Sequence, residues 1–486
     1  QGGFQEVEQM NLFKDMVCYQ EEVRDPSRMA EVLNRVIEKA FRGSAPAQIN
    51  VPRDFWTQVI DIELPPIVRF ERQGGGKDAV DRAAKLLSEA KFPVILSGAG
   101  VVIGDAIDDC KKIAEKLDAP VCNGYQHNDS FPGSHPLAVG PLGYNGSKAA
   151  MELISKADVV LALGTRLNPF STLPGYGIDY WPKDATIIQV DMNPDRIGLT
   201  KKVTVGICGD AKMVAQQILE KLSSNAGDNG REDRKNLIHQ TKSAWLQTLT
   251  SLDHEDDDPG TVWNKEARER DKDRMSPRQA WRAIQAGMPE DVIISSDIGN
   301  NCAIGNAYPT FEKPRKYLAP GLFGPCGYGF PSILGAKIGC PDTPVIGFAG
   351  DGAFGISMNE MSSCAREEWP AITMVIFRNY QWGAEKRNSI LWFDDNFVGT
   401  ELDPELSYAK VADACGLKGV IANTMEETTK AIKQSCEDQK KGITTFIEII
   451  LNQELGEPFR RDAMKKPVKV AGISKSDMRP QKSLVS

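Results

Sequence analysis

The sequence lacks an excess of basic residues, paired cysteines and long apolar runs. Its 486 residues include 58 Lys and Arg against 66 Asp and Glu, a net charge of −8, which argues against a nucleic-acid partner. No segment approaches the ~20 apolar residues that cross a bilayer, so no membrane partner is expected. The ten cysteines contain no C-x-x-C pair, which argues against a zinc site and favours reduced thiols in a cytoplasmic protein.

A complete G-x-G-x-x-G fingerprint is also missing. Strands are predicted over 93–97, 158–163 and 186–191, and the turns that follow them, such as the glycine-rich turn at 97–100, look like nucleotide-binding fingerprints. Glycines after strands are, however, needed simply to fit tight turns between a strand and a helix. We therefore do not expect FAD in this part of the chain, and whether it binds another nucleotide stays open.

What the sequence does contain is the motif Gly350-Asp351-Gly352-Ala353 after the apolar run 345–349. The run predicts a buried strand, so Asp351 is expected at its carboxyl end, where ligands bind in open α/β sheets. The two glycines permit a tight turn and leave backbone N–H groups uncovered for phosphate oxygens. The motif therefore predicts a diphosphate site made by Gly350, Gly352 and Ala353.

Asn379 follows Asp351 after 28 residues (379 − 351 = 28). Between them the sequence predicts a helix over 356–367 and a strand over 371–377, which would deliver Asn379 beside Asp351. Mg²⁺ prefers hard oxygen ligands in an octahedron, and a carboxylate, an amide oxygen, a backbone carbonyl and two diphosphate oxygens fit it well. The spacing thus predicts a magnesium site next to the diphosphate.

This unit of strand, GDG, helix, strand and Asn resembles the signature of the thiamine-diphosphate (ThDP) enzymes. The resemblance implies that Asp351 and Asn379 bind Mg²⁺ through their side chains and Gln381 through its backbone carbonyl. Many of these enzymes have two consecutive Asn at the second position, whereas here the first of the pair is Arg378. Because the second Asn is the implied ligand, we expect this departure to leave the metal site intact.

Two further segments are expected near the cofactor. In the acetolactate-synthase branch of the family, the segment that matches 295–301 contacts the diphosphate and the reaction pocket, which makes Asn300 and Asn301 cofactor candidates; an ordinary polar turn is the alternative. The loop at 321–331 resembles the glycine-rich loop under the thiazolium ring. By that resemblance Gly324 permits close approach, and Cys326 supports the cofactor rather than acting as a nucleophile.

Across essentially the whole chain the sequence is similar to ThDP acetyltransferases that cleave sulfoacetaldehyde with inorganic phosphate, giving sulfite and acetyl phosphate through 2-acetyl-ThDP. Lys386 and Arg387 are expected to open a helix beyond the metal ligands, and cations at a helix amino terminus oppose its dipole, which indicates a bound anion. Solvated surface charges are the alternative. Both substrates are anions, so the candidates that bind them are Lys386, Arg387, Arg460 and Arg461.

The predicted architecture is the three-domain α/β fold of ThDP enzymes, with parallel, doubly wound sheets and an incomplete first domain. The expected parts are the closing helix and strand of a pyrimidine-binding domain at 1–65, a central α/β domain at 78–225, a charged linker at 226–275, a diphosphate- and Mg²⁺-binding domain at 276–455 and a basic tail at 456–486.

The resemblance also implies a homo-oligomer, a dimer or a tetramer, with the cofactor between the pyrimidine domain of one chain and the diphosphate domain of another. The Glu that activates the cofactor belongs to the first half of the pyrimidine domain and is expected upstream of Gln1, so no catalytic residue is assigned. We therefore expect the chain to be an incomplete piece of a longer protein, with little or no activity alone.

Two other functions remain to be distinguished. An acetolactate-synthase-like carboligase, or another 2-oxoacid enzyme of this fold, would share Asp351 and Asn379 but need an apolar pocket for a second keto acid. A non-catalytic binding paralogue would keep the fold without activity. The intact metal and glycine motifs argue against the paralogue, because a silent protein has no reason to retain them.

Overall fold

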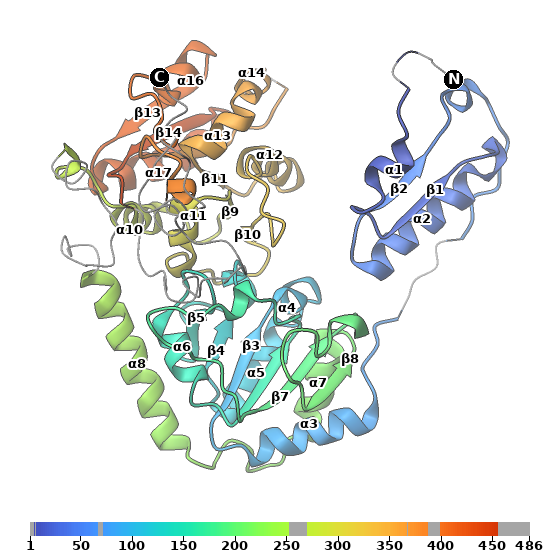
Figure 1. The fold of residues 1–486 in the computed structure, drawn as a ribbon, viewed down its shortest axis with the longest axis vertical. Coiled ribbons are helices and arrows are strands. Elements are labelled where there is room, and N and C mark those ends of the chain that lie inside the picture. The colour runs from blue at the N-terminus through green and yellow to red at the C-terminus, as the bar shows by residue number, and fades with distance from the viewer. Residues whose placement is uncertain are drawn as a thin grey trace, which may run out of the picture. The chain divides into compact units, whose positions relative to one another are not determined.

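The computed structural model of the chain describes residues 4, 6–66, 71–251, 270–366, 368–386 and 399–454. It divides into two compact units, Gln1–Arg72 and Gln73–Ser486 (Figure 1). Within the described ranges, no helix combines the length and the apolar character that a membrane span requires.

The first unit is a small parallel sheet covered by a helix. β1 and β2 pair in parallel, with Tyr19 opposite Ala47. The prediction of a single strand here was wrong, because the polar stretch of β1 has no buried residue and forms a strand only by pairing with β2. The unit contains α1 (Gln9–Phe13), β1 (Tyr19–Glu22), η1 (Pro26–Arg28), α2 (Met29–Gly43), β2 (Ala47–Asn50) and η2 (Arg53–Thr57).

The second unit begins with a six-stranded parallel sheet, here called the central sheet, in the order β5-β4-β3-β6-β7-β8. β3 and β6 are buried along their whole length, which explains their continuous apolar sequences. The elements are α3 (Lys77–Glu89), β3 (Pro93–Ser97), α4 (Ala99–Ile103), α5 (Ile107–Leu117), β4 (Val121–Asn123), η3 (Asn128–Ser130), β5 (Ala138–Pro141), α6 (Lys148–Ile154), β6 (Val159–Leu163), η4 (Phe170–Thr172), β7 (Thr186–Asp191), η5 (Pro194–Arg196), β8 (Val205–Cys208), α7 (Ala211–Lys221) and α8 (Arg231–Ser251).

A second six-stranded parallel sheet, the C-terminal sheet, follows in the order β10-β9-β11-β12-β14-β13. Its elements are α10 (Pro277–Gly287), β9 (Ile293–Ser296), α11 (Asn300–Ile304), η6 (Gly305–Ala307), β10 (Tyr317–Leu318), α12 (Gly329–Gly339), β11 (Val345–Gly350), α13 (Asp351–Ser357), η7 (Met358–Glu360), α14 (Met361–Cys364), β12 (Thr373–Arg378), α16 (Tyr408–Ala414), β13 (Lys418–Ala422), α17 (Met425–Gln439) and β14 (Thr445–Ile450).

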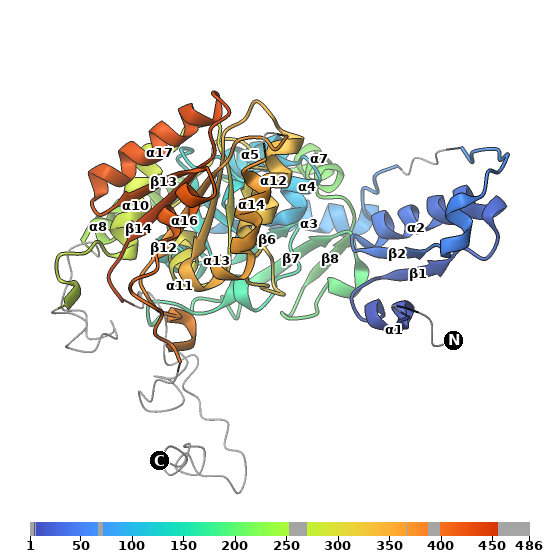
Figure 2. The ribbon, with the colours of Figure 1, turned by 90° about the horizontal axis from the view of Figure 1, so that it is seen from above.

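Helices cover both faces of the C-terminal sheet. Along β11, Ile346 and Phe348 join one apolar core with α10 and α17, whereas Val345 and Ala349 join another with α12 and α13. Figure 2 shows these two helical layers on opposite sides of the strands. The alternation follows the two-residue period of a strand and leaves the carboxyl ends of the strands as the edge where polar residues gather.

The helix expected over 356–367 begins earlier than predicted and is not continuous. α13 starts at Asp351, directly after β11, and a 3₁₀ turn at Met358–Glu360 separates it from α14. Gly350 serves as the N-cap of α13 in an extended conformation (φ −70°, ψ 160°), so the helix begins without an intervening turn. Asp351 is consequently the first helical residue.

Candidate metal and cofactor site

The structure brings the three predicted metal ligands to one edge of the C-terminal sheet. β11 and β12 are neighbouring parallel strands, with Gly350 opposite Phe377. Asp351 follows the first strand and Asn379 the second, and their exposed fractions are 1% and 2%. Gln381 is buried as well, so all three stand where a metal would be enclosed.

The carboxylate of Asp351 is held by three donors. Its Oδ1 accepts the Gly352 N–H at 2.9 Å, and its Oδ2 accepts the Tyr380 N–H at 2.8 Å and Arg378 Nη1 at 3.1 Å. Burial raises the pKa of Asp351 to about 6, against the opposing effect of the Arg378 charge. The carboxylate is therefore oriented, and Oδ1 is the oxygen that fewer donors engage.

Arg378 is a buried neighbour of Asp351 that the sequence did not predict. We expected it to leave the metal site intact, yet it contacts Asp351 itself from a fully buried position. Its Nη2 donates to the carbonyls of Asp403 and, at 3.0 Å, Leu406. A charged residue at the end of a buried apolar strand requires such partners, because an unpaired buried charge is very costly. The position of Arg378 after the apolar run 371–377 was therefore the sign in the sequence that this arginine has buried partners.

Gln381 is held by one hydrogen bond of its side chain. Its Nε2 donates to the Gln453 carbonyl at 2.9 Å, and the preceding residue, Tyr380, adopts a left-handed conformation with φ +60°. Gln453 Nε2 in turn donates to Glu401 Oε2 at 2.8 Å. The backbone around the implied carbonyl ligand is thus anchored to β14's carboxyl-terminal extension.

Asp297 organises the glycine-rich loop and was also missed. It is buried after β9, and its carboxylate accepts the N–H groups of Ile298 at 2.7 Å, Gly327 at 3.1 Å and Gly329 at 2.7 Å. Burial raises the pKa of Asp297, and the backbone donors oppose that rise. An Asp at the end of an apolar strand was visible in the sequence, but its partners in the glycine-rich loop, Gly327 and Gly329, lie 30 and 32 residues away and could not be predicted.

The loop itself requires glycine. Gly324 and Gly327 have φ values of +63° and +86°, and a Cβ on Gly329 would lie 2.8 Å from the Phe348 carbonyl oxygen. Cys326 is an exposed residue of this loop, but neighbouring atoms partly cover its sulfur; this desolvation, together with the negative charge of Asp297, raises the pKa of its thiol. A raised thiol pKa disfavours the thiolate, in keeping with a supporting role for Cys326.

Asn300 and Asn301 are both buried in the first turn of α11. Trp281 Nε1 donates to the Asn301 carbonyl at 2.7 Å, which fixes this turn against α10. The Asn301 Oδ1 has no hydrogen-bond partner among the described residues, as is also true of Gln381 Oε1. A buried amide oxygen without a partner fits a residue that meets a ligand.

Of the four candidates for substrate anions, the structure describes Lys386 alone; Arg387, Arg460 and Arg461 lie outside the described residues. Lys386 belongs to a helical segment that begins at Gly383, so it is not its first residue. Its Nζ lies 2.5 Å from Glu401 Oε1 and 3.5 Å from Gln453 Oε1. Glu401 therefore offsets the charge that was expected to attract an anion.

The donor set fits Mg²⁺ rather than a transition metal. A carboxylate, an amide side chain and a backbone carbonyl are hard oxygen ligands, and the described ranges contain no group of three or more His, Cys, Asp and Glu placed to hold a metal. The remaining ligands would have to come from the diphosphate. An added Cβ on Gly350 meets no atom within 4 Å, which leaves space beside the motif.

The glycine-rich turns of the central sheet have a different environment. A Cβ on Gly98 would lie 2.6 Å from the Gly164 carbonyl oxygen, and one on Gly164, where φ is +61°, would lie 2.7 Å from Gly100 Cα. These glycines allow two turns to pack backbone against backbone. That packing accounts for them without a nucleotide.

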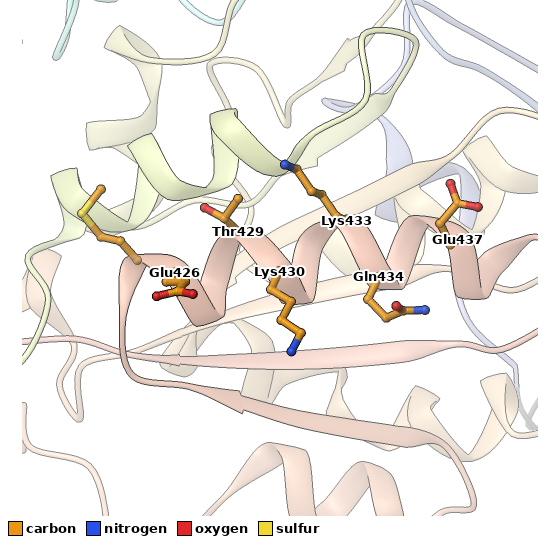
Figure 3. A pocket seen from close by; sticks show the side chains of 7 residues that line it. Glu426, Thr429, Lys430, Lys433, Gln434 and Glu437 are labelled. Carbon is orange, nitrogen blue, oxygen red and sulfur yellow. The ribbon is translucent and has the colours of Figure 1, made fainter.

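A hollow lies along α17, and none of its lining residues is a predicted site residue. Its lining is Met425, Glu426, Thr429, Lys430, Lys433, Gln434 and Glu437 (Figure 3). Alternating charges along one helix face are typical of a solvated surface. We therefore assign no chemistry to it.

Comparison with known proteins places the chain in a family. Residues 80–218 match the central domain of thiamine pyrophosphate enzymes, and residues 297–449 match their C-terminal TPP binding domain. The fold is similar to the crystal structure of benzoylformate decarboxylase from Polynucleobacter necessarius, with a TM-score of 0.72 and 21% identity over 93% of this chain and 79% of that one. This likeness shows the fold.

Relatives with higher sequence identity show to which branch of the family the chain belongs. The probable sulfoacetaldehyde acetyltransferase of Rhizobium meliloti (strain 1021) is 78% identical over 484 residues, which cover 100% of this chain and 82% of that protein. The sulfoacetaldehyde acetyltransferase of Roseovarius nubinhibens is 75% identical over 99% of this chain and 80% of its own length. A probable acetolactate synthase large subunit of Methanocaldococcus jannaschii is 28% identical over 89% of this chain and 71% of its own length. The chain therefore belongs to the sulfoacetaldehyde acetyltransferases within the thiamine pyrophosphate enzymes.

Proposed function

We propose that the protein converts sulfoacetaldehyde and inorganic phosphate into acetyl phosphate and sulfite. The carbon–sulfur bond breaks and sulfite leaves with its electron pair, while the aldehyde carbon becomes the acyl carbon that phosphate takes up. No external oxidant is needed, because the oxidation of that carbon is balanced by reduction of its neighbour to a methyl group. The observation that carries this proposal is 78% identity across the chain to a protein named for the substrate and the transfer.

The edge of the C-terminal sheet would hold the cofactor. The side chains of Asp351 and Asn379 and the backbone carbonyl of Gln381 would bind Mg²⁺, and the backbone at Gly350, Gly352 and Ala353 would approach the diphosphate. When bound, ThDP supplies the carbon nucleophile and the electron sink for the aldehyde carbon. The chain's part is to bind, orient and exclude water.

The neighbouring segments would orient the ring of the cofactor. Asp297 fixes the glycine loop through three backbone donors. Gly324 would let the backbone come close, and Cys326 would support the ring from the same loop. Asn300 and Asn301 would add polar contacts from the first turn of α11. We also propose a homo-oligomer, with each cofactor between two chains.

Both substrates are anions, so positive charge near the site would favour their binding. Lys386, Arg387, Arg460 and Arg461 are the proposed source of that charge. We expect Lys386→Gln and Arg387→Gln to raise KM for sulfoacetaldehyde or phosphate while leaving ThDP affinity nearly intact. A charge-assisted contact corresponds to about ten- to a hundredfold, and Lys386 should fall at the lower end because Glu401 already pairs with it. Unchanged steady-state kinetics in both variants would show that these charges are only solvated.

The decisive assay is release of sulfite by the full-length protein supplied with ThDP, Mg²⁺ and sulfoacetaldehyde. We expect sulfite to appear together with acetyl phosphate, and only when phosphate is present. Formation of 2-acetolactate from pyruvate without any sulfite release would instead assign the protein to the carboligases.

A further inference from the structure

Arg378 is tied to three separate segments around the proposed metal site. The guanidinium lies 3.1 Å from Asp351 Oδ2 at the start of α13 and 3.6 Å from Glu448 Oε1 on β14. It also donates to two carbonyls of the segment that precedes α16, at Asp403 and Leu406. Three guanidinium nitrogens thus face three different parts of the chain.

The partners of Arg378 are themselves fixed. Glu448 accepts Ser407 Oγ at 2.6 Å and the Ala409 N–H at 3.0 Å. The Arg378 guanidinium lies 4.2 Å from the centre of the Tyr380 ring and 5.4 Å from that of Tyr408. Contacts on several sides therefore fix the position of the guanidinium. Because this group is planar and rigid, it can in turn fix the orientation of a carboxylate that it binds.

The same cluster holds Asp351 at two points. Arg378 and the Tyr380 N–H bind Oδ2 of the carboxylate, and the Tyr408 hydroxyl donates to the Asp351 carbonyl at 3.0 Å. Rotation of the Asp351 side chain would break the contact with Arg378. Oδ1, which accepts the Gly352 N–H, is then the oxygen presented in a constant direction.

We propose that Arg378 is a positioning residue that locks the Asp351 carboxylate so that one oxygen is kept for the metal and the other for the protein. The proposal rests on the proposed function, because it takes Asp351 as a ligand of Mg²⁺. Two rival roles predict different effects of removing Arg378 on Mg²⁺ affinity. A guanidinium that acted only as a nearby positive charge would repel Mg²⁺, and one that only stabilised the fold would leave metal affinity unchanged.

Calorimetric titration of Mg²⁺ into the full-length protein at saturating ThDP separates these roles. We expect Arg378→Gln to weaken Mg²⁺ binding by about ten- to a hundredfold, the range for losing one charge-assisted hydrogen bond. Tighter binding would show that Arg378 merely repels the metal, and unchanged binding would show that its role is only structural. Either result overturns the proposal.

The matched control is Arg234, another fully buried arginine, which donates to backbone carbonyls beside the central sheet. Arg234→Gln should lower the melting temperature without changing the Mg²⁺ dissociation constant. If it weakens Mg²⁺ binding as much as Arg378→Gln does, general loosening explains both variants and the positioning role is wrong.

Arg378→Lys keeps the proposal testable should Arg378→Gln fail to fold. Lysine retains the charge but presents one ammonium in place of the fork, so we expect Mg²⁺ binding at least about threefold weaker, a partial loss of one such contact. Wild-type affinity in Arg378→Lys would overturn the proposal. If the Arg378 variants bind Mg²⁺ as the wild type does, and the wild type releases sulfite, the positioning role is refuted but the proposed function stands. If the wild type itself binds no Mg²⁺, the metal site is refuted.

Discussion

The two six-stranded sheets share one strand arrangement but differ at the edge where their strands end. The central sheet has the order β5-β4-β3-β6-β7-β8 and the C-terminal sheet the order β10-β9-β11-β12-β14-β13. The two middle strands are β3 and β6 in the first and β11 and β12 in the second. After β3 and β6 the chain continues with Gly98 and Gly164, whereas after β11 and β12 it continues with Asp351 and Asn379.

The space at the two edges is filled in different ways. At the central sheet, backbone packs on backbone, so that a Cβ on Gly98 would lie 2.6 Å from the Gly164 carbonyl oxygen. At the C-terminal sheet, buried carboxylate, amide and guanidinium groups gather, and Gly350 has open space beside it. The fold thus determines where a ligand site can form, and the residues after the strands determine whether it does.

The largest expected effect comes from removing the charged ligand at the edge of the C-terminal sheet. Asp351→Ala should abolish binding of ThDP with Mg²⁺, since the anionic ligand and the bridge to the diphosphate are lost, while the overall fold is retained. Calorimetry with both ligands measures this. Asp191→Ala, at the end of β7 in the central sheet, serves as the control and should bind as the wild type does. Equal affinity in Asp351→Ala would remove the distinction between the two edges.

A smaller effect is expected on stability, where alanine substitutions of Gly164 and Gly350 should differ. Gly164→Ala should destabilise the protein by about 1–3 kcal/mol, because its φ of +61° is unfavourable for alanine and its Cβ would meet the Gly100 backbone at 2.7 Å. Gly350 has a φ of −70°, and an added Cβ would meet no atom within 4 Å. The free energy of unfolding of Gly350→Ala should therefore stay within about 0.5 kcal/mol of the wild type.

Denaturant unfolding monitored by circular dichroism measures both glycine variants. We also expect Gly350→Ala, but not Gly164→Ala, to weaken ThDP binding in protein that remains folded. The reverse pattern, a stable Gly164→Ala and an unstable Gly350→Ala, would mean that we have misassigned what fills the two edges.

The smallest effect is on pH dependence. With the pKa of Asp351 raised to about 6, the folded metal-free chain favours the protonated carboxyl. Because the pKa of Asp351 is higher in the folded chain than in the unfolded chain, protonation of this carboxyl adds to the free energy of unfolding. That contribution is fully present below the ordinary pKa near 4 and is lost as the pH rises through 6. Mg²⁺ needs the ionised form, so its affinity should fall about tenfold per pH unit below 6. Titrations at pH 7, 6 and 5 measure this, and a flat dissociation constant would contradict it.

Local patterns in the sequence predicted the edge of the C-terminal sheet, since an apolar strand followed by Gly-Asp-Gly and later by Asn specifies a position without knowledge of the fold. Long-range partners were beyond that reach. Arg378 pairs with Glu448, 70 residues later (448 − 378 = 70), and Asp297 binds a loop 30 residues away. Short β1 was missed because its polar sequence becomes a strand only through β2.

The most direct test of the account is a crystal structure of the full-length protein grown with ThDP and Mn²⁺ in place of Mg²⁺, with anomalous scattering used to locate the metal. We predict an anomalous peak at the carboxyl edge of the C-terminal sheet, in contact with Asp351, Asn379 and the Gln381 carbonyl at oxygen distances near the ~2.1 Å typical of Mg²⁺. A peak at the edge of the central sheet, or a diphosphate bound without contact to Asp351, would contradict it.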